Sequence, residues 1–240
     1  MSFLDINLHP DLVRAVEALG WTDPTPIQRQ AVPLILEGRD VLGAAQTGSG
    51  KTGAFALPIL DHLLRKPSPG LRLLVLVPTR ELASQVEQTF RDVGRFTSFK
   101  VATVIGGVGY DQQRRAVSEG AEIMVATPGR LLDHLENRAF RLTTVDHLVM
   151  DEADRMLDMG FLPDIRAILH YVPKERQTLL FSATLVPDVE RVAAFTLKDP
   201  VRVEVARPAT LAEGISQVLY PVVQEQKIDL LLTLLKNTEM

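Results

Sequence analysis

Short apolar runs alternate with longer stretches of helical pattern along most of the chain. The runs end abruptly at polar residues or at Gly and Pro, and they occupy residues 41–44, 71–77, 101–105, 123–126, 147–150 and 178–181. Strands that stay apolar on both faces are typical of a sheet buried between two layers of helices. Helical periodicity lies between the runs, for example over 81–93 and 165–171. The pattern predicts an α/β fold with a doubly wound, mostly parallel sheet and helices on both faces.

Polar residues that interrupt this pattern fall directly after the predicted strands. In doubly wound sheets, ligands bind in the crevice at the carboxyl ends of the strands. We therefore expect the short segments that follow the runs to converge on one rim of the sheet and to form a single site.

One of these segments, residues 45–52, has the sequence Ala-Gln-Thr-Gly-Ser-Gly-Lys-Thr and lies between a predicted strand and a helical pattern. Gly48 and Gly50 allow the backbone to turn its N–H groups inward, and the N-terminus of the following helix adds a partial positive charge. Lys51 can reach the β- and γ-phosphates of a nucleotide, and the hydroxyl of Thr52 can hold Mg²⁺. The alternative, a Gly-Ser turn that happens to precede Lys-Thr, does not explain the flanking strand and helix.

An acidic segment, Asp-Glu-Ala-Asp, follows the predicted strand at 147–150. Asp151 would hold Mg²⁺, and Glu152 would orient and deprotonate the water that attacks the γ-phosphate. Carboxylates also favour helix N-termini because they cap them, so this segment alone leaves both interpretations open. The phosphate-binding segment in the same chain favours the catalytic interpretation.

The composition limits the possible classes of function. The 240 residues are 46% hydrophobic and 23% charged, as in an ordinary globular protein, and they suffice for one large α/β domain or two small ones. Because the formal net charge is -4, nucleic-acid binding must depend on local basic groups. The absence of Cys excludes disulfides and thiolate metal sites, and the five His residues lack metal-ligand spacing. Seeing no signal peptide and no long apolar run, we expect a cytoplasmic protein without a membrane partner.

Asp-Glu-Ala-Asp at 151–154 is the signature of the DEAD-box RNA helicases, and the chain resembles the first RecA-like domain of that family over about residues 3–207. Ala45, where the generic phosphate loop has Gly, matches the family's own form of the loop. Further matches are the Q motif at 20–28, motif Ia at 78–82, the GG motif at 106–107, motif Ib at 127–130 and motif III at 182–184. The opening Ser-Phe and the run Pro-Thr-Pro-Ile-Gln resemble the bacterial RhlE-type subgroup.

The resemblance implies a site for ATP and Mg²⁺. Gln28 offers a donor and an acceptor to adenine, Trp21 would stack on the ring, and the backbone carbonyl of Asp23 would accept from the amine. The nucleotide-binding residues would be Trp21, Asp23, Gln28, Gln46, Thr47, Gly48, Ser49, Gly50, Lys51 and Thr52. Thr52 and Asp151 would hold the metal, and the catalytic residues would be Lys51, Asp151 and Glu152.

The resemblance also implies contacts with RNA, at Pro78, Thr79, Arg80, Gly106, Gly107, Thr127, Gly129 and Arg130. Hydroxyls, glycine N–H groups and guanidinium groups are the usual partners of phosphate oxygens. We therefore expect single-stranded or duplex RNA to be bound through its backbone, without sequence specificity. Asp154, Ser182 and Thr184 would couple the nucleotide site to the RNA.

The same resemblance predicts that the chain consists of two parts that belong to different domains. Residues 1–206 would be the first RecA-like domain, and residues 207–240 a linker and the truncated start of a second one, with a strand at 215–220 and a helix at 227–236. The chain has no His-Arg-x-Gly-Arg stretch, which supplies the arginine fingers in the family. We expect a monomeric piece of a longer helicase that is nearly inactive without its partner, the second domain. Two alternatives stay open: an ATP-dependent RNA clamp that does not unwind, and a P-loop ATPase acting on DNA or protein.

Overall fold

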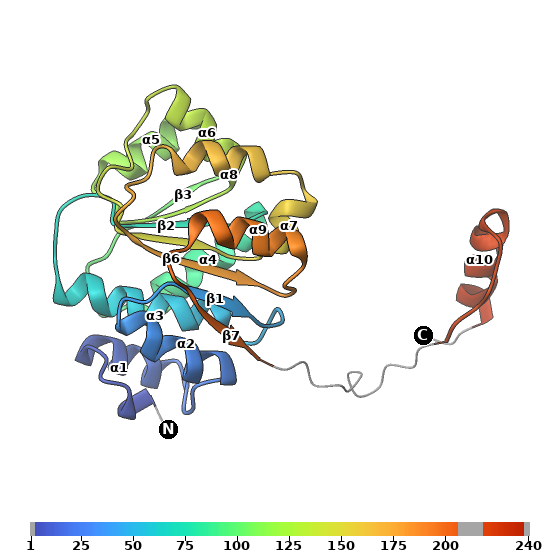
Figure 1. Ribbon diagram of the computed structural model, residues 1–240, viewed down its shortest axis with the longest axis horizontal. Coiled ribbons are helices and arrows are strands. Elements are labelled where there is room, and N and C mark those ends of the chain that lie inside the picture. The colour runs from blue at the N-terminus through green and yellow to red at the C-terminus, as the bar shows by residue number, and fades with distance from the viewer. Residues whose placement is uncertain (1–2, 206–217, 238–240) are drawn as a thin grey trace. The chain divides into compact units, whose positions relative to one another are not determined.

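The computed structural model describes residues 3–205 and 218–237. The chain divides into two compact units, Met1–Arg207 and Pro208–Met240, and Figure 1 labels most of their elements. The first unit contains every site residue predicted above, and it is described first.

A seven-stranded sheet forms the centre of the first unit, and all of its strand pairs are parallel. Its strands are β1 (Val41–Ala44), β2 (Leu73–Leu76), β3 (Val101–Val104), β4 (Ile123–Ala126), β5 (His147–Met150), β6 (Gln177–Ser182) and β7 (Val201–Glu204). They lie in the order β3-β4-β2-β5-β6-β1-β7, so the predicted doubly wound sheet is confirmed. The apolar runs do not predict β7, because it is an edge strand of which only Val203 is buried.

Helices cover both faces of this sheet (Figure 1). They are α1 (Pro10–Ala18), α2 (Pro26–Leu36), α3 (Lys51–Arg65), α4 (Arg80–Val93), α5 (Tyr110–Ser118), α6 (Pro128–Glu136), α7 (Ala153–Asp158), α8 (Leu162–Leu169) and α9 (Pro187–Thr196), preceded by a 3-10 turn at Phe3–Asp5. The core on one side includes Leu12, Ile27, Phe55 and Val86, from α1 to α4. The core on the other side includes Leu131, Met156, Ile165 and Val189, from α6 to α9. These helices therefore bury apolar side chains against both faces of the sheet.

Short connections place helix N-termini at the carboxyl ends of the strands. α6 begins at Pro128, directly after the single residue that follows β4, and α7 begins at Ala153, shortly after β5. The first backbone N–H groups of a helix have no partner within the helix and carry a partial positive charge. These N-termini therefore gather with the predicted site residues on one rim of the sheet.

In the second unit, the described residues form a 3-10 turn at Gln224–Gln226 and helix α10 at Lys227–Asn237, which confirms the predicted helix. The predicted linker after residue 206 lies outside the described residues, as does the first half of the predicted strand at 215–220. Residues 218–220 are described, and they are not in a strand. The assignment of this unit to a second RecA-like domain stays a prediction.

Candidate active site

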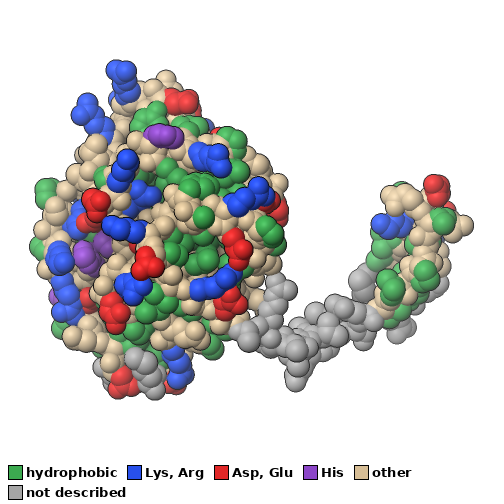
Figure 2. All heavy atoms as spheres, viewed as in Figure 1, with side chains coloured by type: hydrophobic (Ala, Val, Ile, Leu, Met, Phe, Trp, Pro, Cys, Tyr) green, Lys and Arg blue, Asp and Glu red, His purple; other side chains and the backbone are tan. Residues whose placement is uncertain are grey.

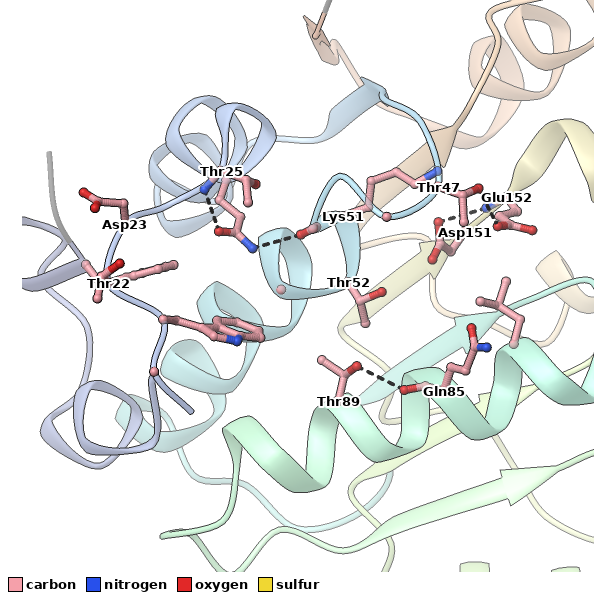
Figure 3. A pocket seen from close by; sticks show the side chains of 18 residues that line it. Thr22, Asp23, Thr25, Thr47, Lys51, Thr52, Gln85, Thr89, Asp151 and Glu152 are labelled. Atoms are coloured by element: carbon pink, nitrogen blue, oxygen red, sulfur yellow. Dashed lines mark hydrogen bonds between the residues drawn. The ribbon is translucent and has the colours of Figure 1, made fainter. Parts of the chain in front are cut away.

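A cavity of about 640 Å³ lies at the rim, in front of the N-terminus of α3. Residues from the segments 20–28, 47–53 and 151–152 line it, together with side chains of α4 (Figure 3). These segments are far apart in the sequence. The structure thus brings the Q-motif segment, the phosphate loop and the acidic segment together around one cavity.

The phosphate loop has a backbone that requires glycine. Gly48 and Gly50 have φ angles of 82° and 89°, in the left-handed region. A Cβ atom on Gly50 would lie 2.8 Å from Nε2 of Gln28, which leaves no room for a side chain. Gly53 is restricted as well, because its Cβ would lie 2.7 Å from the same Nε2 atom and 3.0 Å from the Trp21 ring. These glycines allow the loop and the Q-motif segment to pack closely.

Lys51 carries a buried ammonium group. Its Nζ atom has no hydrogen-bond partner among the residues that the structure describes. Asp151 lines the same cavity and is 2% exposed. Burial raises the pKa of Asp151 to about 6, although the charge of Lys51 and a hydrogen bond from the Glu152 N–H (2.9 Å) act to lower it. Because a buried cation without a partner is costly, this end of the cavity favours an anionic ligand.

Glu152 lies beside the phosphate loop and precedes α7 with a left-handed backbone (φ 51°, ψ 51°). Thr47 Oγ1 donates to Oε1 of Glu152 at 3.2 Å, and Arg155 Nη1 donates to Oε2 at 3.3 Å. The side chains of Thr47, Asp151 and Glu152 lie close together in Figure 3. A carboxylate held beside a phosphate loop can activate a water molecule for attack on a phosphate.

The Q-motif segment forms the other end of the cavity. Gln28 is buried, its Nε2 donates to the carbonyl oxygen of Gly50 at 3.0 Å, and its Oε1 accepts from the N–H of Thr25 at 2.9 Å. Each end of this amide keeps the capacity for one more hydrogen bond, which suits the edge of an adenine. Trp21 is half-buried, and its ring centroid lies 6.2 Å from that of Phe3. Asp23 is exposed and lies in the same lining (Figure 3).

Two arginines join the three segments of the predicted RNA surface. Arg80, at the start of α4, donates to the carbonyl oxygen of Gly106 at 3.3 Å. Arg130, in α6, donates to the carbonyl oxygen of Val108 at 2.9 Å. Gly107 (φ 79°) packs against Arg80, and a side chain at this position would collide with the guanidinium group. The segments of motifs Ia, GG and Ib therefore form one connected surface.

The remaining predicted RNA contacts differ in exposure. Thr79 caps α4, because its Oγ1 accepts from the Leu82 N–H at 3.2 Å. Pro78 and Thr127 are buried, whereas Gly129 is exposed. On the face of the first unit seen in Figure 2, Lys and Arg side chains are interspersed with Asp and Glu. Because the formal net charge of the chain is -4, phosphate binding at the predicted RNA contacts would depend on individual arginines and helix N-termini rather than on a broad positive field.

Asp154 connects the acidic segment to the end of β6. Its Oδ2 accepts from both the N–H (3.0 Å) and the Oγ1 (2.9 Å) of Thr184, and its own N–H donates to Ser182 Oγ at 3.3 Å. Burial raises the pKa of Asp154, but hydrogen bonds to its carboxylate from Thr184, Ser182 and the Arg155 N–H outweigh burial and bring the pKa below its ordinary value. The three predicted coupling residues thus form one hydrogen-bonded cluster.

A family model described as DEAD/DEAH box helicase matches residues 25–192, which is more than half of the chain. The chain belongs to the DEAD/DEAH box helicase family. Its parallel seven-stranded sheet, covered by helices on both faces, is the RecA-like α/β fold of this domain.

Similar curated proteins cover most of this helicase domain. "ATP-dependent rRNA helicase RRP3" of Pyricularia oryzae is 53% identical over 206 residues, which are 85% of this chain and 38% of that protein. The RRP3 protein of Yarrowia lipolytica is 47% identical over 219 residues, or 91% of this chain and 45% of that protein. "DEAD-box ATP-dependent RNA helicase CshA" of Bacillus subtilis is 43% identical over 235 residues, or 98% of this chain and 47% of that protein. The chain thus spans less than half the length of these relatives.

Most of the predicted nucleotide-binding residues of this helicase domain line the 640 Å³ cavity at the rim, but two of them do not. Gln46 lines a second cavity, of about 490 Å³, on the side of β6 and β7. Ser49 is absent from the lining of the first cavity, and its Oγ atom is buried without a hydrogen-bond partner in the described part of the chain. Contacts of these two side chains with a nucleotide stay predictions.

Sequence reasoning misses other residues of the site. Gln85 and Thr89, on α4, line the cavity together with Leu82 (Figure 3). Their spacing of three and four residues marks one helix face, but spacing does not show that the face borders a cavity. Arg155 is missed as well, although it directly follows the acidic segment and lies one helical turn from Glu152.

Within residues 3–205 and 218–237, no helix is long and apolar enough to cross a membrane. The same residues contain no cluster of three or more His, Asp or Glu side chains arranged to hold a metal ion. A Mg²⁺ ion that is bound by one carboxylate, one hydroxyl, water and phosphates needs no such cluster.

Proposed function

We propose that this chain is the ATP-binding domain of an ATP-dependent RNA helicase, which couples ATP hydrolysis to the unwinding or remodelling of RNA. Lys51 carries this proposal, because its buried ammonium group has no hydrogen-bond partner among the described residues. A nucleotide phosphate would supply that partner. The names of the relatives, which are ATP-dependent RNA helicases, support ATP and RNA as the ligands.

The residues around the cavity fit ATP with Mg²⁺. The turn at Gly48 and Gly50, the N-terminus of α3 and the ammonium group of Lys51 would hold the phosphates. Thr52 and Asp151 would hold Mg²⁺, which when bound neutralises the charge that develops on the phosphate oxygens. At the other end of the cavity, the amide of Gln28 and the ring of Trp21 would hold the adenine.

Glu152 would orient and deprotonate the attacking water. Its carboxylate is held by Thr47 and Arg155 and lines the same cavity as Asp151. General-base catalysis by a positioned group contributes about 10²- to 10⁴-fold in rate. The loss of Glu152 is therefore expected to reduce turnover far more than it reduces nucleotide binding.

RNA would be bound through its backbone, on the surface that Arg80 and Arg130 form with the glycine loop. Their hydrogen bonds to Gly106 and Val108 leave further guanidinium donors for phosphate oxygens. Such binding weakens steeply as the salt concentration rises. The Asp154 cluster would link this surface to the nucleotide site.

We further infer that hydrolysis requires a second RecA-like domain. The chain spans 38% of RRP3 from Pyricularia oryzae and 47% of CshA, which leaves room for such a domain in these relatives. A second domain would provide the arginine finger, which contributes about 10³- to 10⁵-fold in rate in comparable enzymes. Residues 1–240 alone are expected to bind nucleotide and barely to hydrolyse ATP.

Two substitutions test the proposal in a protein that contains both domains. Lys51→Ala is expected to lose nucleotide binding, because the phosphates lose their buried cation. Glu152→Gln is expected to keep ADP affinity by calorimetry and to lose RNA-stimulated ATPase activity. Full turnover by Glu152→Gln would show that another group is the base. Robust RNA-stimulated turnover by residues 1–240 alone would refute the need for a second domain.

Other assays separate the remaining alternatives. A strand-displacement assay beside an RNA-binding assay distinguishes a helicase from an RNA clamp. Stimulation of the ATPase by RNA, but not by DNA, distinguishes both from a P-loop ATPase that acts on DNA or protein. A monomeric state, a cytoplasmic location and the RhlE-type subgroup stay predictions, and the names RRP3 and CshA lend no support to that subgroup.

A further inference from the structure

Glu152 has both of its carboxylate oxygens engaged in the structure. Oε1 accepts from the hydroxyl of Thr47 at 3.2 Å, and Oε2 accepts from the guanidinium group of Arg155 at 3.3 Å. Each carboxylate oxygen accepts up to two hydrogen bonds, so both keep a lone pair for a water molecule. Because the Glu152 side chain is only 10% exposed, these two donors, rather than bulk water, set its orientation.

Arg155 belongs to none of the motifs that predict the site, yet its position is fixed by the fold. It lies three residues after Glu152, and residues with this spacing share one face of a helix. Glu152, with its left-handed backbone, is the N-cap residue of α7, and Arg155 lies in the first turn of that helix. Arg155 is therefore the cation of α7 that contacts the proposed base.

The charge of Arg155 also acts on a carboxylate of α4. The pKa of Glu81 is lowered mainly by a hydrogen bond from its own backbone N–H, and further by the Thr79 side chain and by the charges of Arg80 and Arg155. The charge of Arg155 thus acts on α4 as well as on Glu152. An exposed ion pair alone holds a side chain weakly. The pair between Arg155 and Glu152 is not fully exposed, because the Arg155 side chain is 57% exposed and the Glu152 side chain only 10% exposed.

We propose that Arg155 is a positioning residue for ATP hydrolysis, which holds the carboxylate of Glu152 in the orientation that activates the attacking water. The inference rests on the proposed function of Glu152 as the base. A planar guanidinium group has donors in a fixed arrangement, and it defines the orientation of a carboxylate better than an ammonium group does. Thr47 fixes the other oxygen from the phosphate loop, so the base is tied to the element that would hold the phosphates.

The test compares Arg155→Ala, Arg155→Lys and a control in the full-length protein. Arg155→Ala is expected to lower the RNA-stimulated kcat about tenfold, which is part of the contribution of a general base. KM for ATP, ADP affinity and the melting temperature are expected to stay unchanged. Arg155→Lys is expected to recover part of the loss, because it keeps the charge without the planar donors. Arg191→Ala is the control, since Arg191 on α9 pairs with Asp188 at the same spacing, outside the cavity.

Combination with Glu152→Gln separates this inference from the function on which it rests. If Arg155 acts through the carboxylate, Arg155→Ala changes the single-turnover rate of Glu152→Gln by less than about twofold. An equal loss in both backgrounds, or a loss confined to ATP affinity, overturns the role of Arg155. An unchanged kcat of Arg155→Ala beside an inactive Glu152→Gln also overturns it, while the proposed base stands. Full activity of Glu152→Gln overturns the proposed base itself, and the role of Arg155 with it.

Discussion

The side chain of Gln28 donates from Nε2 to the carbonyl oxygen of Gly50 at 3.0 Å and thereby ties the start of α2 to the phosphate loop. The same amide accepts from the N–H of Thr25, so one side chain connects the segment that would read the base with the loop that would hold the phosphates. If these roles hold, base recognition and phosphate binding would depend on the same residue.

Gln28→Glu is expected to weaken ADP binding at least tenfold. The substitution keeps an acceptor for Thr25, but it places a carboxylate oxygen against the carbonyl oxygen of Gly50 and removes a donor to adenine. A site that hydrogen-bonds one particular edge rejects analogues that present another pattern, so the wild type is expected to prefer ADP to GDP strongly. Calorimetry with both nucleotides measures the two effects, and equal affinities of the wild type for ADP and GDP would contradict this role of Gln28.

Asp151→Asn is expected to raise the melting temperature of the nucleotide-free protein at pH 7. Burial raises the pKa of Asp151 to about 6, so the folded chain holds the proton more tightly than the unfolded chain does. The contribution of this group to stability therefore falls as the pH rises from about 4 to about 6, and the ionised carboxylate is unfavourable at pH 7. For a domain of this size, each kcal/mol shifts the melting temperature by about 2–4 °C.

The control for this prediction is the same pair of proteins at pH 4, where the two melting temperatures are expected to converge. At pH 7 the variant is expected to lose Mg²⁺-dependent ATPase activity in the two-domain protein. A variant that melts below the wild type at pH 7 would show that Asp151 stabilises the nucleotide-free fold.

Asp146→Asn is expected to destabilise the first unit by about 2–3 kcal/mol, since it leaves the buried guanidinium group of Arg72 without a counter-charge. Burial acts to raise the pKa of Asp146, but hydrogen bonds from His147 and from Arg72 Nε, both at 2.7 Å, bring it down to about 2. This stabilisation is complete above about pH 4 and is lost as the pH falls towards 2.

Urea denaturation at pH 7 and at acidic pH measures the effect of Asp146→Asn. Asp188→Asn, in an exposed ion pair with Arg191, is the matched control and is expected to change stability by less than about 1 kcal/mol. Equal effects of the two substitutions at pH 7 would show that burial of Arg72 is unimportant.

Asp154→Ala is expected to reduce the RNA stimulation of the ATPase about tenfold in the two-domain protein, while ADP affinity changes by less than about twofold. The substitution removes the acceptor for both donors of Thr184 and leaves only the backbone N–H bond to Ser182 between α7 and the end of β6. Asp154→Asn keeps one acceptor oxygen and is expected to lose less. ATPase titrations with single-stranded RNA give the answer, and a loss confined to nucleotide affinity would assign Asp154 to the nucleotide site alone.

Truncation after Arg207 is expected to leave the melting temperature and ADP affinity nearly unchanged. The described core and the lining of the main cavity come from the first unit alone. Ile228, Leu231, Leu232 and Leu235 of α10 are exposed, so removing them is also expected to reduce self-association in light scattering. A large loss of stability or affinity would show that the second unit contributes to the fold of the first.

Features that depend on local pattern were predictable from the sequence. Apolar runs such as 123–126 predict buried parallel strands, because both faces of the sheet are covered. The phosphate loop and the acidic segment follow such runs, so their meeting at one rim follows from the parallel topology. The apolar pattern does not predict β7, because it is an edge strand with a neighbouring strand on one side only. Only Val203 of this strand is buried, so its apolar signal in the sequence is weak.

Features that depend on tertiary packing were not predictable. The sequence suggests that the amide of Gln28 is free to contact adenine. In the structure this amide is buried and donates a hydrogen bond to the carbonyl oxygen of Gly50. Gln46 turns towards β6 and β7 rather than into the main cavity. Gln85 lines that cavity because α4 packs beside α3, and no local pattern encodes this contact.

The pairing of β1 with β6 and β7 also determines when this part of the sheet can form during synthesis of the chain. Its residue Ala44 aligns with Ser182 of β6 and with Glu204 of β7, so β1 lacks its second neighbour until about 160 further residues have been synthesised. At typical rates of translation this takes about 10 to 30 s. Until then the strand that precedes the phosphate loop has unpaired backbone groups on the side that β7 will cover. We therefore expect nucleotide to be captured only by a nearly finished unit.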